Sequence, residues 1–313
     1  MNRPPTALLV ILSLLALLLL LAHCATPPAP DTADWRAATR DNVRRERDVT
    51  NPPTSLALSA TDELTETVYL PLTCRNWPPF ADWGATGDLL GWAVSTAGDV
   101  NGDGYADIIV GAPRYSNGET EEGAALLYLG GPGGPAASPA WTGESDQPYA
   151  WFGYSIAAAG DVNGDGYGDV IVGAPRYDIT GTVALTDAGQ VFLYYGGPAG
   201  IVTSTVWITH AAQAHARFGS AVAAAGDVNG DGFGDVIVTA NGYDAEETNE
   251  GAAFLYHGGP TGLDTTAAWA VHPTDQAYAN FGRSASTAGD VNGDGYSDVI
   301  VGASWYDSGD TDD

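Results

Sequence analysis

The chain has 313 residues and a formal net charge of −28, from 39 acidic and 11 basic residues. A surface this negative repels nucleic acid and anionic membranes, so neither is expected as a partner. Two cysteines cannot build a disulfide framework, while 41 glycines with many Val, Ile, Tyr and Trp favour short strands and tight turns.

The first 24 residues are predicted to be an export signal. Arg3 supplies a short positive region, and Ala7 to Ala22 is an apolar run interrupted only by Ser13. The run is long for a signal core and slightly short of the roughly 20 apolar residues of a spanning helix. A cleaved signal is the first interpretation, with an uncleaved anchor or lipidation at Cys24 as alternatives, although His23 departs from a lipoprotein box. In each case the protein is secreted or displayed at the cell surface, with membrane contact only through the anchor or lipid.

Residues 25–66 are predicted to be a disordered or tether segment. Asn51-Pro52-Pro53 ends any helix there, because proline disfavours helix in the residues before it. Residues 67–313 are assigned to the folded part. Within it, Thr67 to Leu72 is predicted to be an isolated strand, at a sheet edge because of Pro71.

The rest of the chain is periodic. The block Ala-Gly-Asp-Val-Asn-Gly-Asp-Gly recurs at intervals of 62, 66 and 63 residues, starting at Ala97, Ala159, Ala225 and Ala288. Between copies lie an apolar block ending in Gly-Gly-Pro and a short run around Trp141, Trp207 or Trp269. One unit is therefore four strands, which in the second unit are expected at Tyr154–Ala159, Val170–Gly173, Gln190–Tyr195 and Thr203–His210. Such units predict an all-β fold, a β-propeller of four-stranded blades, with units near residues 90–151, 152–217, 218–280 and 281–313, the last one truncated.

Each copy of the block opens a nine-residue loop of the form Asp-x-Asn-x-Asp-Gly-x-x-Asp. Positions 1, 3, 5 and 9 offer side-chain oxygens, the glycine at position 6 allows a sharp turn, and position 7 offers a backbone carbonyl. These hard donors suit calcium, whereas zinc and copper prefer His or Cys. Clustered carboxylates also repel one another unless a cation lies between them. We therefore predict about four Ca²⁺ ions, held by Asp99, Asn101, Asp103, Tyr105, Asp107, Asp161, Asn163, Asp165, Tyr167, Asp169, Asp227, Asn229, Asp231, Phe233, Asp235, Asp290, Asn292, Asp294, Tyr296 and Asp298.

Two other loop types do not fit. An EF-hand places its last acidic ligand at position 12 between helices. Here position 9 is the acid, and strand-forming residues such as Ile108-Ile109-Val110 follow at once. Dockerin-type repeats also lie on helices, at a shorter spacing. No catalytic residue is predicted, because the sequence shows neither a Ser-His-Asp order nor a zinc motif, and the histidines lack ligand spacing.

Phe-Gly pairs precede three of the loops, and Gly-Ala-Pro follows two of them. With these motifs the chain resembles the FG-GAP repeat family, typified by the N-terminal propeller of integrin α subunits, from about Leu90 to Asp313. The resemblance implies that each calcium loop joins the first two strands of a blade on one face of the disc. Family propellers usually have seven blades, so four units predict an incomplete ring. The motifs, with the departures in the first, third and fourth units, are Phe152-Gly153, Phe218-Gly219, Phe281-Gly282, Gly111-Ala112-Pro113, Gly173-Ala174-Pro175, Leu90-Gly91-Trp92, Thr239-Ala240-Asn241 and Gly302-Ala303-Ser304.

The same resemblance implies a non-enzymatic calcium-binding module for adhesion or for binding an extracellular protein or glycan. Its alternatives are an accessory or catalytic part of a secreted hydrolase, since carboxylate pairs are abundant, and a purely structural cell-surface spacer. The acidic loops, such as Tyr115 to Glu122, are expected to be solvated and not to form a second cation site. Recurrent glutamines are expected in inter-blade packing, at Gln147, Gln213 and Gln276.

Overall fold

The computed structural model describes residues 66–69, 84–87, 89–181, 183–273 and 276–307. The predicted signal, Cys24 and nearly all of the predicted tether lie outside these residues. The chain divides into two units, Met1–Asp62 and Glu63–Asp313, and the second holds every described element. All regular elements of the described part are strands, and none of its segments forms a helix long and apolar enough to cross a membrane.

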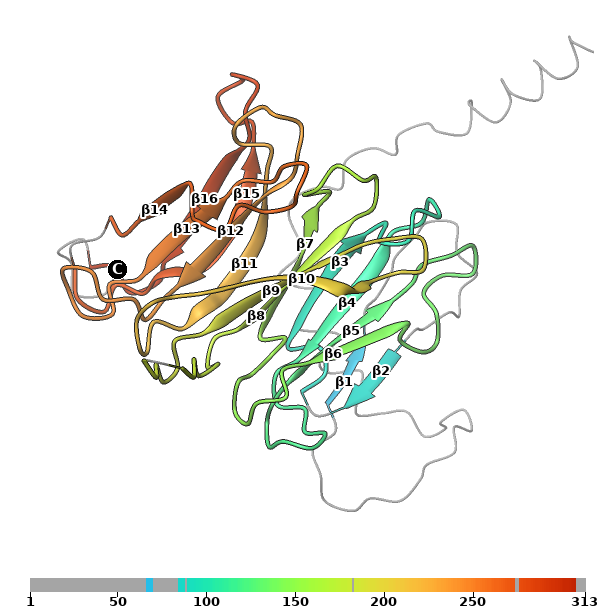
Figure 1. The fold of residues 1–313 in the computed structure, drawn as a ribbon, viewed down its shortest axis with the longest axis horizontal. Coiled ribbons are helices and arrows are strands. Elements are labelled where there is room, and N and C mark those ends of the chain that lie inside the picture. The colour runs from blue at the N-terminus through green and yellow to red at the C-terminus, as the bar shows by residue number, and fades with distance from the viewer. Residues whose placement is uncertain (1–65, 70–83, 88, 182, 274–275, 308–313) are drawn as a thin grey trace, which may run out of the picture. The chain divides into compact units, whose positions relative to one another are not determined.

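Three four-stranded antiparallel sheets and one two-stranded sheet follow one another along the chain (Figure 1). Within each sheet the strands neighbour one another in chain order. The strands predicted for the second unit are present as β7 to β10, and their ends differ from the prediction by at most one residue. The strands are β3 (Ala93–Gly98), β4 (Asp107–Ala112), β5 (Ala124–Tyr128), β6 (Trp141–Glu144); β7 (Ser155–Gly160), β8 (Asp169–Ala174), β9 (Gln190–Tyr195), β10 (Val202–His210); β11 (Phe218–Gly226), β12 (Asp235–Ala240), β13 (Ala252–Tyr256), β14 (Trp269–Val271); β15 (Phe281–Gly289) and β16 (Asp298–Ala303).

The first strand of each sheet contacts the first strand of the next, in the series β3, β7, β11 and β15. This is the arrangement of propeller blades around an axis, and the described sheets form an arc that does not close into a ring (Figure 1). An additional antiparallel pair joins β1 (Glu66–Tyr69) to β2 (Gly84–Gly87). The prediction of an isolated strand at Thr67 was therefore wrong, because the glycine-bounded segment Gly84–Gly87 was not recognised as its partner.

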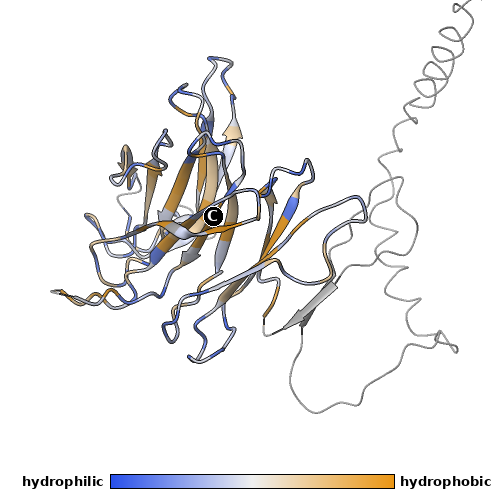
Figure 2. Ribbon diagram, turned by 45° about the vertical axis from the view of Figure 1, so that its right-hand side comes forward, coloured by the Kyte–Doolittle hydropathy of each residue, from blue (hydrophilic) through white to orange (hydrophobic). Residues whose placement is uncertain are grey.

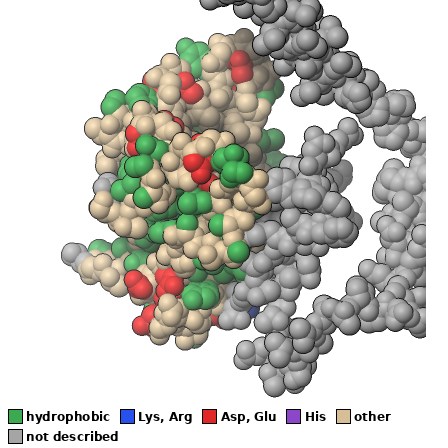
Figure 3. Space-filling model, turned by 90° about the vertical axis from the view of Figure 1, so that its right-hand side faces the viewer, with side chains coloured by type: hydrophobic (Ala, Val, Ile, Leu, Met, Phe, Trp, Pro, Cys, Tyr) green, Lys and Arg blue, Asp and Glu red, His purple; other side chains and the backbone are tan. Residues whose placement is uncertain are grey.

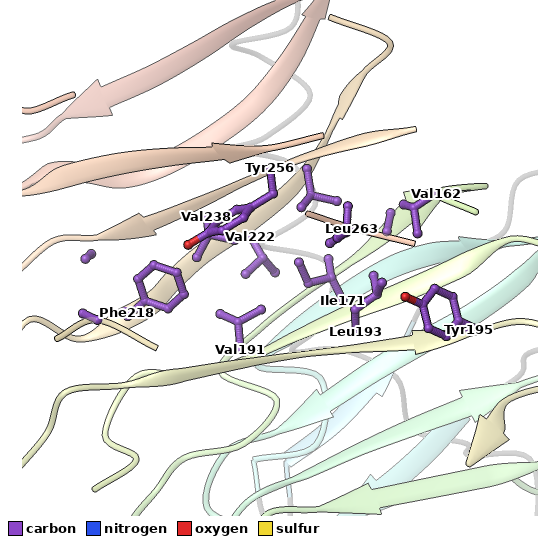
Figure 4. Close-up of a cluster of buried hydrophobic side chains, with 14 of the residues drawn as sticks. Val162, Ile171, Val191, Leu193, Tyr195, Phe218, Val222, Val238, Tyr256 and Leu263 are labelled. Carbon is purple, nitrogen blue, oxygen red and sulfur yellow. The ribbon is translucent and has the colours of Figure 1, made fainter. Parts of the chain in front are cut away.

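The core lies between consecutive sheets, where apolar strands face each other (Figure 2). Between the second and third sheets, Val191 and Leu193 of β9 face side chains of β11 and β12 (Figure 4). The phenylalanine of each Phe-Gly pair belongs to the interface with the preceding blade, where Phe152 and Phe218 are at most 1% exposed. Burying a side chain of this size stabilises the fold by about 1.5–3 kcal/mol.

The two motifs that define the repeat meet across each interface. A Cβ atom added to Gly111 would lie 2.0 Å from the carbonyl oxygen of Gly153, and one added to Gly173 would lie 2.3 Å from that of Gly219. In the third unit threonine replaces this glycine, and the Thr239 hydroxyl instead donates to the carbonyl of Gly282 at 2.7 Å. A polar bond thus replaces the close backbone approach, which explains why threonine can replace the glycine of Gly-Ala-Pro at this position.

The recurrent glutamines also join neighbouring blades, as predicted. The side chain of Gln147 accepts a hydrogen bond from the Asp178 backbone N–H and donates one to the Asp178 carbonyl. Gln213 and Gln276 make the same pair of bonds with Asp244 and Asp307. Each glutamine therefore clamps the loop that follows the second strand of the next blade.

Replacing Gly111 with alanine is expected to lower the free energy of unfolding by about 1–3 kcal/mol, because the new methyl group pushes two blade backbones apart. Gly133→Ala is the matched control, since a Cβ atom there meets nothing within 4 Å. Urea denaturation of the two variants measures the difference. Equal midpoints would contradict the close contact between the motifs.

The outer face of the fourth sheet is open to solvent. Ile109, Ile171 and Ile237 occupy equivalent positions in the first three sheets and are fully buried, whereas Ile300 in β16 is 62% exposed. No described residue covers this face as the following blade covers the others.

Candidate functional site

All four predicted loops connect the first and second strands of a sheet, as the resemblance implied. The first runs from the end of β3 to Asp107, the first residue of β4. Its Asp99 and Asn101 are half-buried and Asp103 is exposed. The second and third loops occupy the same place before β8 and β12, and the fourth lies before β16.

Side-chain oxygens at positions 1, 3 and 5 fold around the turn of the loop. In the first loop, the backbone N–H of Asp103 donates to Asp99 Oδ1 at 3.0 Å and to Asn101 Oδ1 at 3.1 Å. The second oxygen of Asp99 accepts from Gly104 N–H at 2.8 Å, and Asn101 Nδ2 donates to Asp103 Oδ2 at 2.9 Å. The same bonds recur in the other three loops.

The aspartate at position 9 has a structural role that the sequence pattern did not reveal. Both oxygens of buried Asp169 accept backbone N–H groups, from Val162 and from Gly196, each at 2.9 Å. Asp107 and Asp235 make the equivalent bonds and are also buried. The second donor is the first glycine of the Gly-Gly-Pro block, so this carboxylate ties the third strand to the loop.

Burial raises the pKa of Asp169 to about 7. Its two amide hydrogen bonds oppose the rise, and the nearby carboxylates of Asp165 and Asp161 add to it. The pKa values of Asp107 and Asp235 are raised in the same direction, with burial again the largest cause. A cation between the carboxylates of a loop would cancel their mutual repulsion.

Consecutive loops are joined to each other. The backbone N–H at position 8 donates to the position 1 carbonyl of the preceding loop, as from Gly168 to Asp99 at 2.8 Å, and the two following loop pairs repeat this bond. The aromatic ring at position 7 lies on the position 4 glycine of the preceding loop, as Tyr167 does on Gly102. Phe233 and Tyr296 lie in the same way on Gly164 and Gly230. The loops therefore form one connected row on one side of the blades.

The donor set of each loop fits a hard cation. Its side-chain donors are carboxylate and amide oxygens, with no nitrogen or sulfur ligand. The carboxylates of one loop are nevertheless spread around its turn. Across the described ranges, the one acidic trio with ligand atoms within 4.8 Å of one another lies elsewhere, at Glu122, Glu144 and Asp146.

A second feature is a basic and aromatic surface formed by seven residues of the first, second and fourth units. Arg176 lies over the ring of Trp151, with 3.8 Å from its Cζ atom to the ring centroid, and Trp151 stacks on Tyr154 at 5.9 Å. Arg283 Nη1 donates to the Tyr154 hydroxyl at 3.2 Å. The residues of this surface, which we call the arginine surface, are Trp92, Arg114, Trp151, Tyr154, Arg176, Arg217 and Arg283.

The arginine surface contains every arginine of the described residues, and the whole chain has no lysine. Elsewhere acidic groups dominate, as in the patches of red side chains on the face in Figure 3. Two hollows share Trp151 and Tyr154, one of about 250 Å³ beside Trp92 and Arg114 and one of about 100 Å³ beside Arg176 and Arg217. One acid, Glu121, lies within the surface, where it accepts from Trp151 Nε1 at 3.1 Å and lies 3.9 Å from Arg114.

The prediction that the acidic loops are solvated was wrong for two residues. Glu122 and Glu250 are fully buried, although their neighbours in the loops are mostly exposed. Both immediately precede the glycine that begins the third-strand block, and that position faces the next blade. The sequence signal was the fixed distance of these glutamates from Gly123 and Gly251.

Comparison with known proteins agrees with the repeat assignment. The FG-GAP repeat model matches residues 90–128, 152–194, 218–256 and 281–313. Integrin alpha-V of Gallus gallus is 34% identical over 226 residues, which cover 70% of this chain and 20% of that protein. Integrin alpha pat-2 of Caenorhabditis elegans is 35% identical over 229 residues, covering 69% of this chain and 18% of that protein. The chain thus spans about a fifth of the length of these relatives.

Proposed function

The chain is an FG-GAP repeat protein that resembles the integrin α propeller, and from this we propose that it is an exported, calcium-stabilised binding module with an adhesion-type role. Calcium ions in the four loops hold the row of loops together and so keep the blades in register. The arginine surface, and not the row of loops, binds the ligand. Its partner is an acidic group on an extracellular protein or glycan.

The observation that carries this proposal is the gathering of arginines in an otherwise acidic chain. Like charges are not brought together for stability, since each added arginine repels the others. Stacking on Trp151 holds the Arg176 guanidinium in place while its N–H groups remain available to a carboxylate or sulfate. Arg114, Arg217 and Arg283 are exposed, so an acidic partner can reach them.

Arg176→Ala is expected to weaken binding of an acidic ligand at least about tenfold, because a hydrogen bond to a charged group contributes roughly 1.5–3 kcal/mol. Titration of the full chain with a glutamate-rich peptide, and separately with a sulfated glycan, measures the affinity and tells the two partner classes apart. Arg176→Lys is the matched variant, since it keeps the charge and loses the planar stacked fork. Equal affinity of the wild type and Arg176→Ala for both ligands would overturn the proposal.

The alternative of a hydrolase has no specific support in the described residues. Asp107, Asp169 and Asp235 accept two backbone N–H groups each, which gives their burial a structural explanation. A screen against glycoside and ester substrates tests this alternative. If the chain is only a structural spacer, no ligand should bind saturably at the arginine surface. The titration with acidic ligands therefore also tests this alternative.

A further inference from the structure

Glu122 lies at the end of the loop between β4 and β5, fully buried. Its Oε1 atom accepts backbone N–H groups from Asn117 at 2.6 Å and from Glu119 at 3.4 Å. Its Oε2 atom is buried and has no hydrogen-bond partner. A buried carboxylate oxygen in this condition is costly unless a ligand satisfies it.

Two further carboxylates lie beside Glu122. One oxygen from each of Glu122, Glu144 and Asp146 lies within 4.8 Å of the other two. Glu144 is half-buried and is held in place by Asn117 Nδ2, at 3.2 and 3.1 Å from its two oxygens. No arginine or histidine in the described residues forms an ion pair with any of the three. Three acids therefore converge with no positive group of the chain between them.

The third unit carries a glutamate at the same position, with a different side chain beside it. Glu250 is the counterpart of Glu122, since each accepts the Phe-Gly backbone N–H of the next blade through its carbonyl, from Phe281 and Phe152 respectively. His272 stands three residues after Trp269, as Glu144 stands three after Trp141. His272 Nδ1 lies 3.1 Å from Glu250 Oε1, while Glu250 Oε2 is buried without a hydrogen-bond partner, as Glu122 Oε2 is.

The second unit avoids the problem, because Ala188 occupies the equivalent buried position. At this buried position the second unit has no acid and the third has an acid beside a histidine. The first unit has an acid that faces two more acids. Among the described residues of these units, the buried acid of the first unit faces two further carboxylates and no basic side chain.

We propose that Glu122, Glu144 and Asp146 bind a calcium ion. Calcium–oxygen distances of about 2.3–2.6 Å place ligand oxygens on opposite sides of the ion about 4.6–5.2 Å apart, which matches the size of this trio. The ion would satisfy the free oxygen of Glu122 and balance the three charges, with water filling the remaining positions. Zinc is disfavoured because the trio offers no histidine or cysteine.

This site is separate from the four loops. β4 begins at Asp107 in the calcium loop and ends at Ala112, where the loop to Glu122 starts. The two sites therefore lie at opposite ends of the first blade, about 20 Å apart for a strand of this length. The trio site would order residues 113–123 and leave the row of loops unchanged.

Hydrogen exchange of the full chain, with and without about 1 mM calcium, tests the proposal at peptide resolution. Calcium should slow exchange in residues 115–123 of the wild type. Asp146→Asn removes one charge at an exposed position and should raise the calcium concentration for half-maximal protection at least about tenfold. Glu144→His copies the third unit and should make residues 115–123 protected without calcium.

Residues 243–251, which contain Glu250 of the Glu250–His272 pair, are the internal control and should respond equally in all three proteins. Equal calcium responses of residues 115–123 in the wild type and both variants, or no response in the wild type, would overturn the site. The loop residues 99–107 report separately on calcium binding in the four loops. Calcium can protect residues 115–123 without protecting residues 99–107, and the reverse is also possible, so the two proposals are tested independently.

Discussion

Replacing Asp169 with alanine should lower the free energy of unfolding by about 2–6 kcal/mol. The substitution leaves the N–H groups of Val162 and Gly196 without their acceptor at a fully buried position, and each orphaned buried group costs about 1–3 kcal/mol. The loss should be measured by urea denaturation with a chelator present. Under this condition the effect reports on the two amides and not on a lost calcium ligand.

Two companion variants sharpen this test. Asp169→Asn keeps one acceptor oxygen and should lose about half as much stability, roughly 1–3 kcal/mol. Asp264→Ala removes a carboxylate that is exposed and should have little effect. If Asp169→Ala were as stable as Asp264→Ala, the proposed structural role of position 9 would be wrong.

Removal of calcium should also lower the stability of the folded state strongly, because it affects all four loops together. At a free calcium concentration of one to ten times the dissociation constant, each occupied loop adds about 0.4–1.4 kcal/mol to the stability of the folded state. Four loops contribute about 2–6 kcal/mol, which is a large share of a typical stability of roughly 5–15 kcal/mol. Chelation should therefore lower the melting temperature and expose the chain to protease.

Magnesium at the same concentration is the control for this experiment. Magnesium requires a near-ideal octahedral shell and loses its water reluctantly, so it should restore little of the lost stability. An unchanged melting temperature and unchanged protease resistance after chelation would show that the loops do not depend on calcium.

The fold was predictable because each repeat carries its own boundaries. The Asp-rich loop, the Gly-Gly-Pro block and the tryptophan run mark the strands of a unit, and β7 to β10 lie within one residue of their predicted places. The Phe-Gly and Gly-Ala-Pro motifs were recognisable as signatures, but their mutual contact was not. That contact joins Gly111 to Gly153 of the next unit, and only the packing of blades brings the two together.

The site was predictable only in part. Residue types and spacing pointed to the four loops, yet they described position 7 as a carbonyl donor and missed its ring, which lies on the preceding loop as Tyr167 does on Gly102. The arginine surface was not predicted from the sequence, because Arg114, Arg217 and Arg283 occupy different positions of the repeat. Their proximity depends on the curvature of the arc, which no single repeat encodes.

Counting the bound ions tests most directly whether calcium joins these repeats. Equilibrium dialysis of the full chain against calcium, in the Glu144→His variant that lacks the additional trio site, measures the loops alone. Four saturable ions per chain are expected, with half-saturation at about 10⁻⁴–10⁻³ M. The absence of saturable calcium binding in that range would show that calcium does not join the repeats.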